Sequence, residues 1–115
     1  MPKRIIRNKS FLHEVSRSKS FRRKTLIKKA TKDNIDALSE VALNTLLGNV
    51  PLSDPHKQKL KRHRFNIRKL AKKVSFKRKK EFLIQKGGFL PLLVTPVLSI
   101  LGGLAANALT HLAGL

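Results

Sequence analysis

Residues 33–75 decide the fold, and they read DNIDALSEVALNTLLGNVPLSDPHKQKLKRHRFNIRKLAKKVS. Apolar residues recur at helical spacing through the first part of this stretch, at Ile35, Leu38, Val41, Ala42 and Leu46. Asp33 or Asn34 can cap the start of this helix, and Gly48 can occupy the position just after its end. The spacing therefore predicts a helix from about residue 33 to Gly48.

A second helix is expected after the turn around Pro51. Ser53 or Asp54 can cap it, with Pro55 at its first position, and it should run to about Lys73. Its apolar stripe is narrow and consists of Leu60, Ile67, Leu70, Ala71 and Val74. We expect the apolar stripes of the two helices to face one another as a helical hairpin.

Charge divides the chain around this hairpin. The 115 residues include 26 Lys or Arg and 6 Asp or Glu, which leaves a net charge of +20. Residues 1–32 and 57–86 are strongly basic, residues 33–56 contain acids but no Lys or Arg, and residues 87–115 contain no charged side chain. These boundaries predict a basic arm (1–32), a basic helical hairpin domain (33–86) and an apolar tail (87–115). The acidic first helix is expected to screen one side of the basic second helix.

The basic arm lacks a sustained apolar period and is rich in Ser, Lys and Arg. Such a segment cannot bury enough apolar surface to offset the entropy lost on ordering, so residues 1–32 are expected to be disordered. No apolar run of signal-peptide length follows Lys3 and Arg4, which argues against a secretory signal. A mitochondrial presequence is the alternative, with an apolar helix face made of Ile5, Ile6, Phe11, Leu12 and Val15.

The tail from Phe89 onward reads FLPLLVTPVLSILGGLAANALTHLAGL and is long enough to cross a bilayer. Pro96 would interrupt a helix that starts at Phe89, so a helix with Thr95 as cap and Pro96 as first residue fits better. A small, highly charged body cannot cover such a stretch on all sides. We therefore expect residues 89–115 to meet a membrane, a second copy of the chain or a protease. A core helix and an unstructured tail are the alternatives.

A third, shorter helix is expected between the hairpin and the tail. Ser75 can cap it, and it should run from Phe76 to about Gln85 before Gly87 and Gly88 end it. The predicted fold class is mostly α, with a disordered basic arm, a small helical hairpin with a third short helix, and an apolar C-terminal helix.

Side chains for enzyme chemistry are scarce. The chain has no Cys, and His56 and His63 share a helix face on which neighbouring Lys side chains oppose a metal cation. The sequence offers no basis for a Ser–His–Asp arrangement, paired carboxylates or a phosphate-binding glycine loop. We therefore expect no enzymatic activity, no metal, no cofactor and no small-molecule substrate.

The junction between the basic and apolar segments reads QKGGFLPLLV at residues 85–94. A very basic segment followed by Gly-Gly, an apolar residue, Leu-Pro-Leu-Leu and an apolar tail resembles the precursors of adenovirus core protein X. The GNVPLS turn at residues 48–53, with the basic helix and KKVS at residues 72–75 after it, is similar to X-like proteins of adintoviruses and Polinton-type elements. The resemblance covers about residues 35–115.

The resemblance implies a viral core protein of the virion and the host nucleus. Precursors of this kind condense the genomic DNA and are cut by the viral cysteine protease after Gly-Gly. On this sequence, the resemblance places the processing site at Gly87, Gly88 and Phe89, with the cut between Gly88 and Phe89.

Composition points to the same partner independently, because a charge of this density repels itself and needs a polyanion. Non-sequence-specific binding and condensation of double-stranded DNA is the leading hypothesis. The phosphate contacts are expected from Arg22, Arg23, Lys24, Lys57, Lys59, Lys61, Arg62, Arg64, Arg68, Lys69, Lys72, Lys73, Lys77, Arg78, Lys79 and Lys80.

Two other partners fit part of the sequence. Lys77 to Lys86 precede the apolar tail, as in a membrane-active or tail-anchored protein whose bulk faces the cytoplasm. A ribosomal or other RNA-binding protein would explain the charge but gives no reason for the tail.

Overall fold

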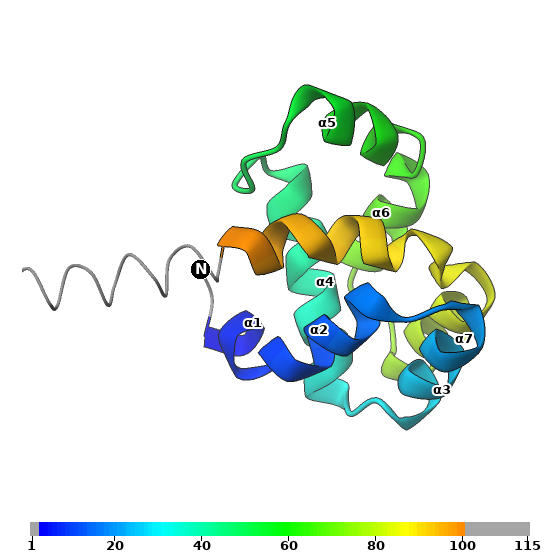
Figure 1. The fold of residues 1–115 in the computed structure, drawn as a ribbon. Coiled ribbons are helices and arrows are strands. Elements are labelled where there is room, and N and C mark those ends of the chain that lie inside the picture. Colours follow the sequence, from blue (N-terminus) through cyan, green and yellow to red (C-terminus); the bar gives the residue numbers. More distant parts are fainter. Residues whose placement is uncertain (1–2, 101–115) are drawn as a thin grey trace, which may run out of the picture.

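The computed structural model describes residues 3–100, and all regular secondary structure in that range is helical. Its elements are α1 (Lys3–Arg7), α2 (Lys9–Arg17), α3 (Ser20–Lys29), α4 (Lys32–Leu46), α5 (Asp54–Lys61), α6 (Arg64–Ala71), α7 (Phe76–Lys86), the 3₁₀ turn η1 (Gly87–Phe89) and a helix of residues 90–100. The mostly α fold class is therefore confirmed (Figure 1). The predicted course of the tail after residue 100 lies outside the described residues.

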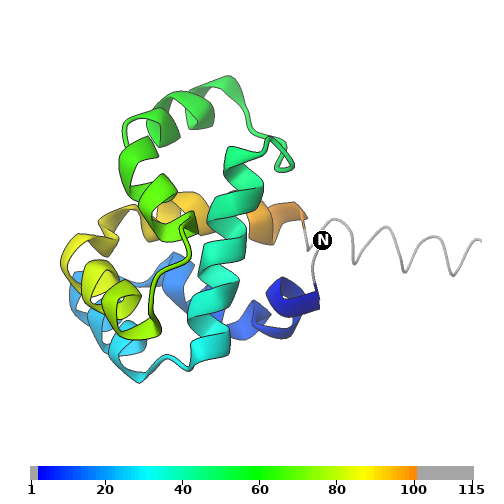
Figure 2. The ribbon, with the colours of Figure 1, turned by 180° about the vertical axis from the view of Figure 1, so that it is seen from behind.

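The centre of the fold is the pair α4 and α6, which run side by side (Figure 2). Ile35, Leu38 and Val41 of α4 are buried, as are Ile67 and Leu70 of α6. These residues belong to the two stripes that the helical spacing placed face to face, so the predicted pairing is confirmed for them. Leu46 and Val74, which were assigned to the same stripes, are exposed and lie outside the contact.

Gly48 follows α4 as predicted, and its backbone explains why glycine stands there. Its φ is +76°, a left-handed conformation that side chains disfavour. The Gly48 N–H donates to Thr45 O at 3.2 Å, and the Asn49 N–H donates to Asn44 O at 2.9 Å. These two bonds form a Schellman ending, which satisfies carbonyls at the end of the helix.

The predicted N-terminal caps are correct for α5 and α7 and wrong for α4. The hydroxyls of Ser53 and Ser75 cap α5 and α7. The predicted cap of α4 is wrong, because Thr31 accepts the Asn34 N–H while the Asn34 side chain accepts the Thr31 N–H. This reciprocal capping box moves the start of the helix to the residue before Asp33.

The predicted second helix is two helices in the structure. The chain bends at Arg62 and His63, which separate α5 from α6. The bend lets α5 lie across the end of the α4–α6 pair while α6 runs beside α4 (Figure 1). It also brings the His63 ring to a stacked position 6.4 Å from the Phe89 ring, centre to centre. One straight helix to Lys73 could not meet both requirements.

The basic arm is folded, which contradicts the predicted disorder. Residues 3–29 form α1, α2 and α3, and Ile5, Leu12, Val15 and Ile27 are fully buried. These four side chains join the same hydrophobic cluster as residues 89–98. The arm alone has too little apolar surface to fold, but it covers a core whose other half comes from the far end of the chain.

The segment after α7 belongs to that core. Turn η1 redirects the chain, and the helix of residues 90–100 crosses the molecule in Figure 1. Phe89, Leu90, Leu93, Val94 and Val97 are at most 2% exposed. The expectation that the apolar tail leaves the body is wrong for residues 89–98, because the folded arm supplies the cover that was thought to be missing.

One of the two predicted helix boundaries in this segment is confirmed and the other is wrong. Gly87 and Gly88 end α7 as predicted, in a 3₁₀ turn that leads directly into the next helix. Thr95 lies inside that helix and does not cap a new one, since its Oγ1 donates to Pro91 O at 2.6 Å.

A histidine from α5 compensates for the proline inside this helix. Pro96 has no N–H, so the carbonyl of Leu92, four residues earlier, lacks its usual helical donor. His56 Nε2 donates to Leu92 O at 2.9 Å and replaces that donor from outside the helix. The bond ties α5 to the helix of residues 90–100 and satisfies a partly buried carbonyl.

Leu12→Ala tests whether the arm belongs to the core. Removing this buried side chain should lower the free energy of unfolding by about 2–5 kcal/mol, measured by urea denaturation with far-UV circular dichroism. Lys9→Ala, at an exposed position of the same helix, is the matched control and should change it by less than about 0.5 kcal/mol. A Leu12→Ala variant as stable as the wild-type protein would contradict a folded arm.

A double-mutant cycle tests the compensation of Pro96 by His56. His56→Ala should lower the free energy of unfolding by about 1–3 kcal/mol, because it leaves the Leu92 carbonyl without a donor. In a Pro96→Ala background the restored N–H binds that carbonyl, so the same substitution should cost at least about 0.5 kcal/mol less. Additive effects of the two substitutions would show that the bond does not have this role.

Candidate nucleic-acid interface

The surface of the described residues carries charge of almost one sign. Of the 26 Lys and Arg residues, all are exposed except Arg4, Arg23, Lys79 and Lys80. The acids are fewer and half of them are partly covered, so that the exposed ones are Glu14, Asp54 and Glu81. Cations therefore dominate what a partner would meet.

Two acids of α4 bind α1, and the third, Asp36, pairs with Lys32 of α4 itself, so none of them pairs with the basic second helix. Asp33 accepts two bonds from Arg7, at 2.8 and 3.0 Å, and one from Arg4 Nε at 3.1 Å. Glu40 Oε1 accepts from Arg4 Nη1 at 2.7 Å. The expected screening of the basic second helix is therefore wrong, because the folded α1 presents two planar guanidinium groups to these carboxylates.

The cations of the basic segment, residues 57–86, have no ion-pair partner among the described residues. The cations that do form ion pairs come from the first third of the chain and are Arg4, Arg7, Arg22 and Lys32. Segment 57–86 therefore keeps its positive charge available to a ligand.

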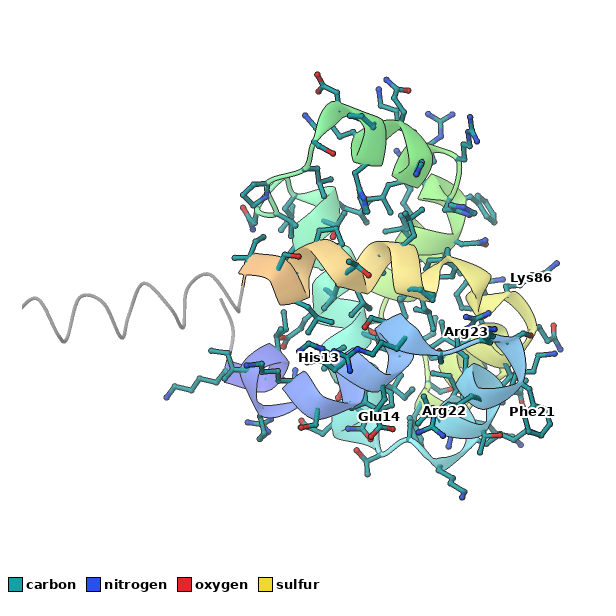
Figure 3. All side chains as sticks on the ribbon, viewed as in Figure 1. His13, Glu14, Phe21, Arg22, Arg23 and Lys86 are labelled. Atoms are coloured by element: carbon teal, nitrogen blue, oxygen red, sulfur yellow. The ribbon has the colours of Figure 1, made fainter. Side chains whose placement is uncertain are left out.

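Most of the predicted phosphate-binding residues lie exposed on α3, α5, α6, α7 and their linkers. They are Arg22, Lys24, Lys57, Lys59, Lys61, Arg62, Arg64, Arg68, Lys69, Lys72, Lys73, Lys77 and Arg78. Helix α3 packs on α7, so its cations extend the surface of the basic segment. Figure 3 shows Arg23 of α3 and Lys86 of α7 at the same end of the molecule.

Two of the predicted residues hold the fold together instead of pointing freely into solvent. Lys80 Nζ donates to Lys28 O at 2.6 Å and to Ala30 O at 3.3 Å, where α3 ends and carbonyls lack helical donors. Arg23 Nη1 donates to Ser18 O at 3.1 Å. Both side chains join α3 to its surroundings, so their charges are only partly available to phosphate.

Lys79 is buried, with 6% of its surface exposed. Its Nζ donates to Ser39 Oγ of α4 at 2.8 Å, and burial lowers its pKa. This position fits the packing of α7 on α4 better than a phosphate contact. The sequence carried a signal for it, because Lys79 stands four residues before the core residue Leu83 and so shares its helix face.

A groove of about 850 Å³ lies between α6 and α7. Its cationic lining includes Arg68, Lys69, Lys72, Arg78 and Lys86. Its apolar lining consists of Phe65, Val74 and Phe82. Sequence reasoning missed Phe65 because the chain has few aromatic residues. The available signal was a Phe inside a basic run and outside the apolar stripe of α6.

The predicted processing site lies in η1. Gly87 and Phe89 are buried and Gly88 is exposed. A Cβ at Gly87 would stand 3.3 Å from Leu90 Cδ1, so the turn packs closely against the helix that follows. The bond between Gly88 and Phe89 is therefore held in a helical conformation at the edge of the core.

The histidines that share a predicted helix face have other contacts. His56 binds the Leu92 carbonyl, and His63 stacks on Phe89. Within residues 3–100, no three His, Asp or Glu side chains gather where they could hold a metal ion.

Comparison with known proteins finds no matching family model and no significant match among curated proteins or solved structures. The resemblance to core protein X precursors therefore stays a prediction.

Asp33→Asn tests the contact between α1 and α4. The Arg7 guanidinium, with Asn8 and Arg4, holds the pKa of Asp33 well below its usual range. Such a carboxylate stabilises the folded state above its unfolded-state pKa, and the contribution is lost as the pH falls through the folded-state pKa. The variant should therefore be less stable than wild type at pH 7, with a gap that narrows below about pH 4.

Urea denaturation between pH 2 and pH 8 measures this gap, with Glu81→Gln as the control. Glu81 is exposed and forms no ion pair among residues 3–100. Its neutralisation should change stability little at any pH. A stability gap for Asp33→Asn that does not vary with pH would mean that the ionised carboxylate is not what holds α1.

Proposed function

We propose that this protein binds and condenses double-stranded DNA without reading its sequence, as a core protein packaged with a viral genome. One observation carries the proposal: the cations of residues 57–86 form no ion pair within the described residues, while the acids of α4 pair with Arg4, Arg7 and Lys32. A net charge of +20 on a small folded body is otherwise costly, because the charges repel one another.

Counterion release supplies the affinity. Each Lys or Arg that neutralises a phosphate frees a condensed cation from the DNA, and this term does not depend on base sequence. Twenty net charges correspond to the phosphates of about 10 base pairs. The exposed cations belong to separate helices, such as α3 and α5, so one molecule has cations on more than one side with which to bridge neighbouring duplexes.

We do not propose that the protein recognises a particular DNA base sequence. Lys and Arg occupy most exposed positions of α5 and α6. Neither helix carries a row of Asn or Gln side chains along its surface that could form hydrogen bonds with base edges. Because residues 3–29 are folded, their cations are held on helices α1–α3 and not on a disordered arm. We infer that the protein recognises phosphate density.

A membrane anchor is the second candidate. The helical run Phe76–Ile100 is long and apolar enough to span a bilayer by length and composition. Its apolar half contributes Phe89, Leu93 and Val97 to the core, so insertion would unfold the body. Because this segment is buried in the core, it is not free to enter a membrane or to pair with a second copy of the chain. The burial therefore favours a nucleic acid as the partner of the described residues.

Processing after Gly88 carries a structural condition. A cysteine protease binds its substrate as an extended chain, whereas Gly88 and Phe89 lie in a 3₁₀ turn against the core. We infer that a viral protease reaches this bond only when η1 and the helix after it open, or before the chain folds. Cleavage would also separate residues 89–98 from the body that they stabilise.

The salt dependence of duplex binding tests the proposed function. If about 10 ion contacts form, the slope of log K against log salt should be near −9, and affinity should fall about 3 × 10⁵-fold between 50 and 200 mM salt. Fluorescence anisotropy with labelled AT-rich and GC-rich duplexes measures both the slope and the sequence preference. A salt-independent affinity, or flotation with anionic liposomes without any DNA binding, would remove the proposal.

A pair of triple variants tests where the duplex binds. Arg68→Gln, Lys72→Gln and Arg78→Gln together should reduce the magnitude of the salt slope by about 3, because each lost phosphate contact removes about 0.9. The control neutralises three exposed cations of α1 and α2, namely Lys3, Lys9 and Arg17. A control variant that loses as much of the slope as the first would place the interface elsewhere.

A further inference from the structure

We propose that the groove between α6 and α7 binds an unpaired nucleotide, with its base on the ring of Phe65 and its phosphate on the surrounding cations. This inference rests on the proposed function and deepens it. Duplex binding needs only the exposed charge, whereas the groove adds a site that distinguishes a base from a bare phosphate chain.

Phe65 is the aromatic residue that packing does not explain in this part of the fold. Its surface is 77% exposed, whereas the neighbouring rings of Phe76 and Phe82 pack against the core. It stands between the exposed cations Arg64 and Arg68 on α6. Exposed aromatic rings set among cations are the platforms on which single-stranded nucleic acids stack their bases.

The second ring in the groove is already engaged. Lys69 Nζ lies 4.9 Å from the centre of the Phe82 ring, and Phe82 also packs against Phe89 with ring centres 6.2 Å apart. Among residues 3–100, Phe65 has no aromatic or cation partner of this kind. Its ring is therefore the one that remains for a ligand.

The size and lining of the groove fit one nucleotide. Its volume of about 850 Å³ lies within the range of small-ligand pockets, about 300–1,000 Å³, and is too small to admit a duplex. Arg68, Lys72 and Arg78 line it and can contact phosphate. Gln85 also lines it, and its amide can both donate to and accept from a base edge.

Charge complementarity selects a nucleic acid strand as the occupant. The groove carries cations that have no ion-pair partner in the described residues, together with one carboxylate, Glu81. A carboxylate disfavours an acidic side chain beside it but can accept a hydrogen bond from a base N–H, such as the N3–H of thymine or uracil. The regular alternation of base and phosphate along an unpaired strand matches Phe65 and the cations around it.

The test compares strands that carry the same phosphates with and without bases. The probes are a ten-residue oligothymidylate, an oligouridylate of equal length and an abasic strand of equal length, with binding measured by fluorescence anisotropy at one salt concentration. The wild-type protein should bind the oligothymidylate about tenfold more tightly than the abasic strand. Phe65→Ala should lose most of this preference.

Phe21→Ala is the matched control. Phe21 is also exposed and flanked by cations, but it lies on α3 and does not line the groove (Figure 3). This variant should keep the preference, and circular dichroism checks that both variants fold. Equal binding of oligothymidylate and abasic strand by the wild-type protein overturns the nucleotide site, as does an equal loss of preference in the two variants.

The remaining outcomes separate this site from the proposed function. A wild-type protein that binds duplex DNA but shows no preference for bases leaves the proposed function standing without the groove site. A protein that binds no duplex at low salt overturns both. If the protein binds oligouridylate as tightly as oligothymidylate, the result supports a nucleotide site that accepts both ribose and deoxyribose. Displacement of the oligothymidylate by a Phe-containing polyglutamate peptide at lower concentration would assign the groove to an acidic protein and overturn the proposal.

Discussion

The structure depends on the burial of an uncharged segment beneath helices that repel one another. A body with a net charge of +20 gains little from mutual attraction between its surfaces, so its cohesion must come from apolar contact. Residues 89–98 supply much of that contact and lie in one cluster with side chains from α1, α2, α3, α4 and α6. The uncharged end of the chain thus allows the basic helices to fold while their charge faces outward.

The few acids have a role set by the same constraint. Asp33 and Glu40 fasten α1 to α4, and the bidentate contact with Arg7 is the geometry that guanidinium and carboxylate favour. These pairs are partly exposed, so their value lies more in position than in energy. As a result, Asp33 and Glu40 attach α1 to α4, and the basic segment of residues 57–86 keeps its cations free of ion pairs within the described residues.

The features of the fold that could be predicted from the sequence are those that depend on residues close to one another in the chain. The spacing of Ile35 and Leu38, the turn at Gly48, and the caps Ser53 and Ser75 were readable because each acts within a few residues. The folding of residues 3–29 was not readable, because Leu12 and Ile27 join a cluster that includes residues 89–98 of the far end of the chain. The exposed basic residues of the candidate site were predictable from charge, whereas the groove requires the angle between two helices.

The arm, the hairpin and the apolar segment form one cooperative body whose positive charge lies on the outside. Amide hydrogen exchange on the full chain, followed by mass spectrometry, measures whether these three parts open together. We expect segments containing Leu12, Val41 and Leu93 to exchange with similar protection and to lose it together at the same urea concentration. Rapid exchange of residues 9–17 or 90–98 while α4 stays protected would contradict it, because those segments would then not share one core.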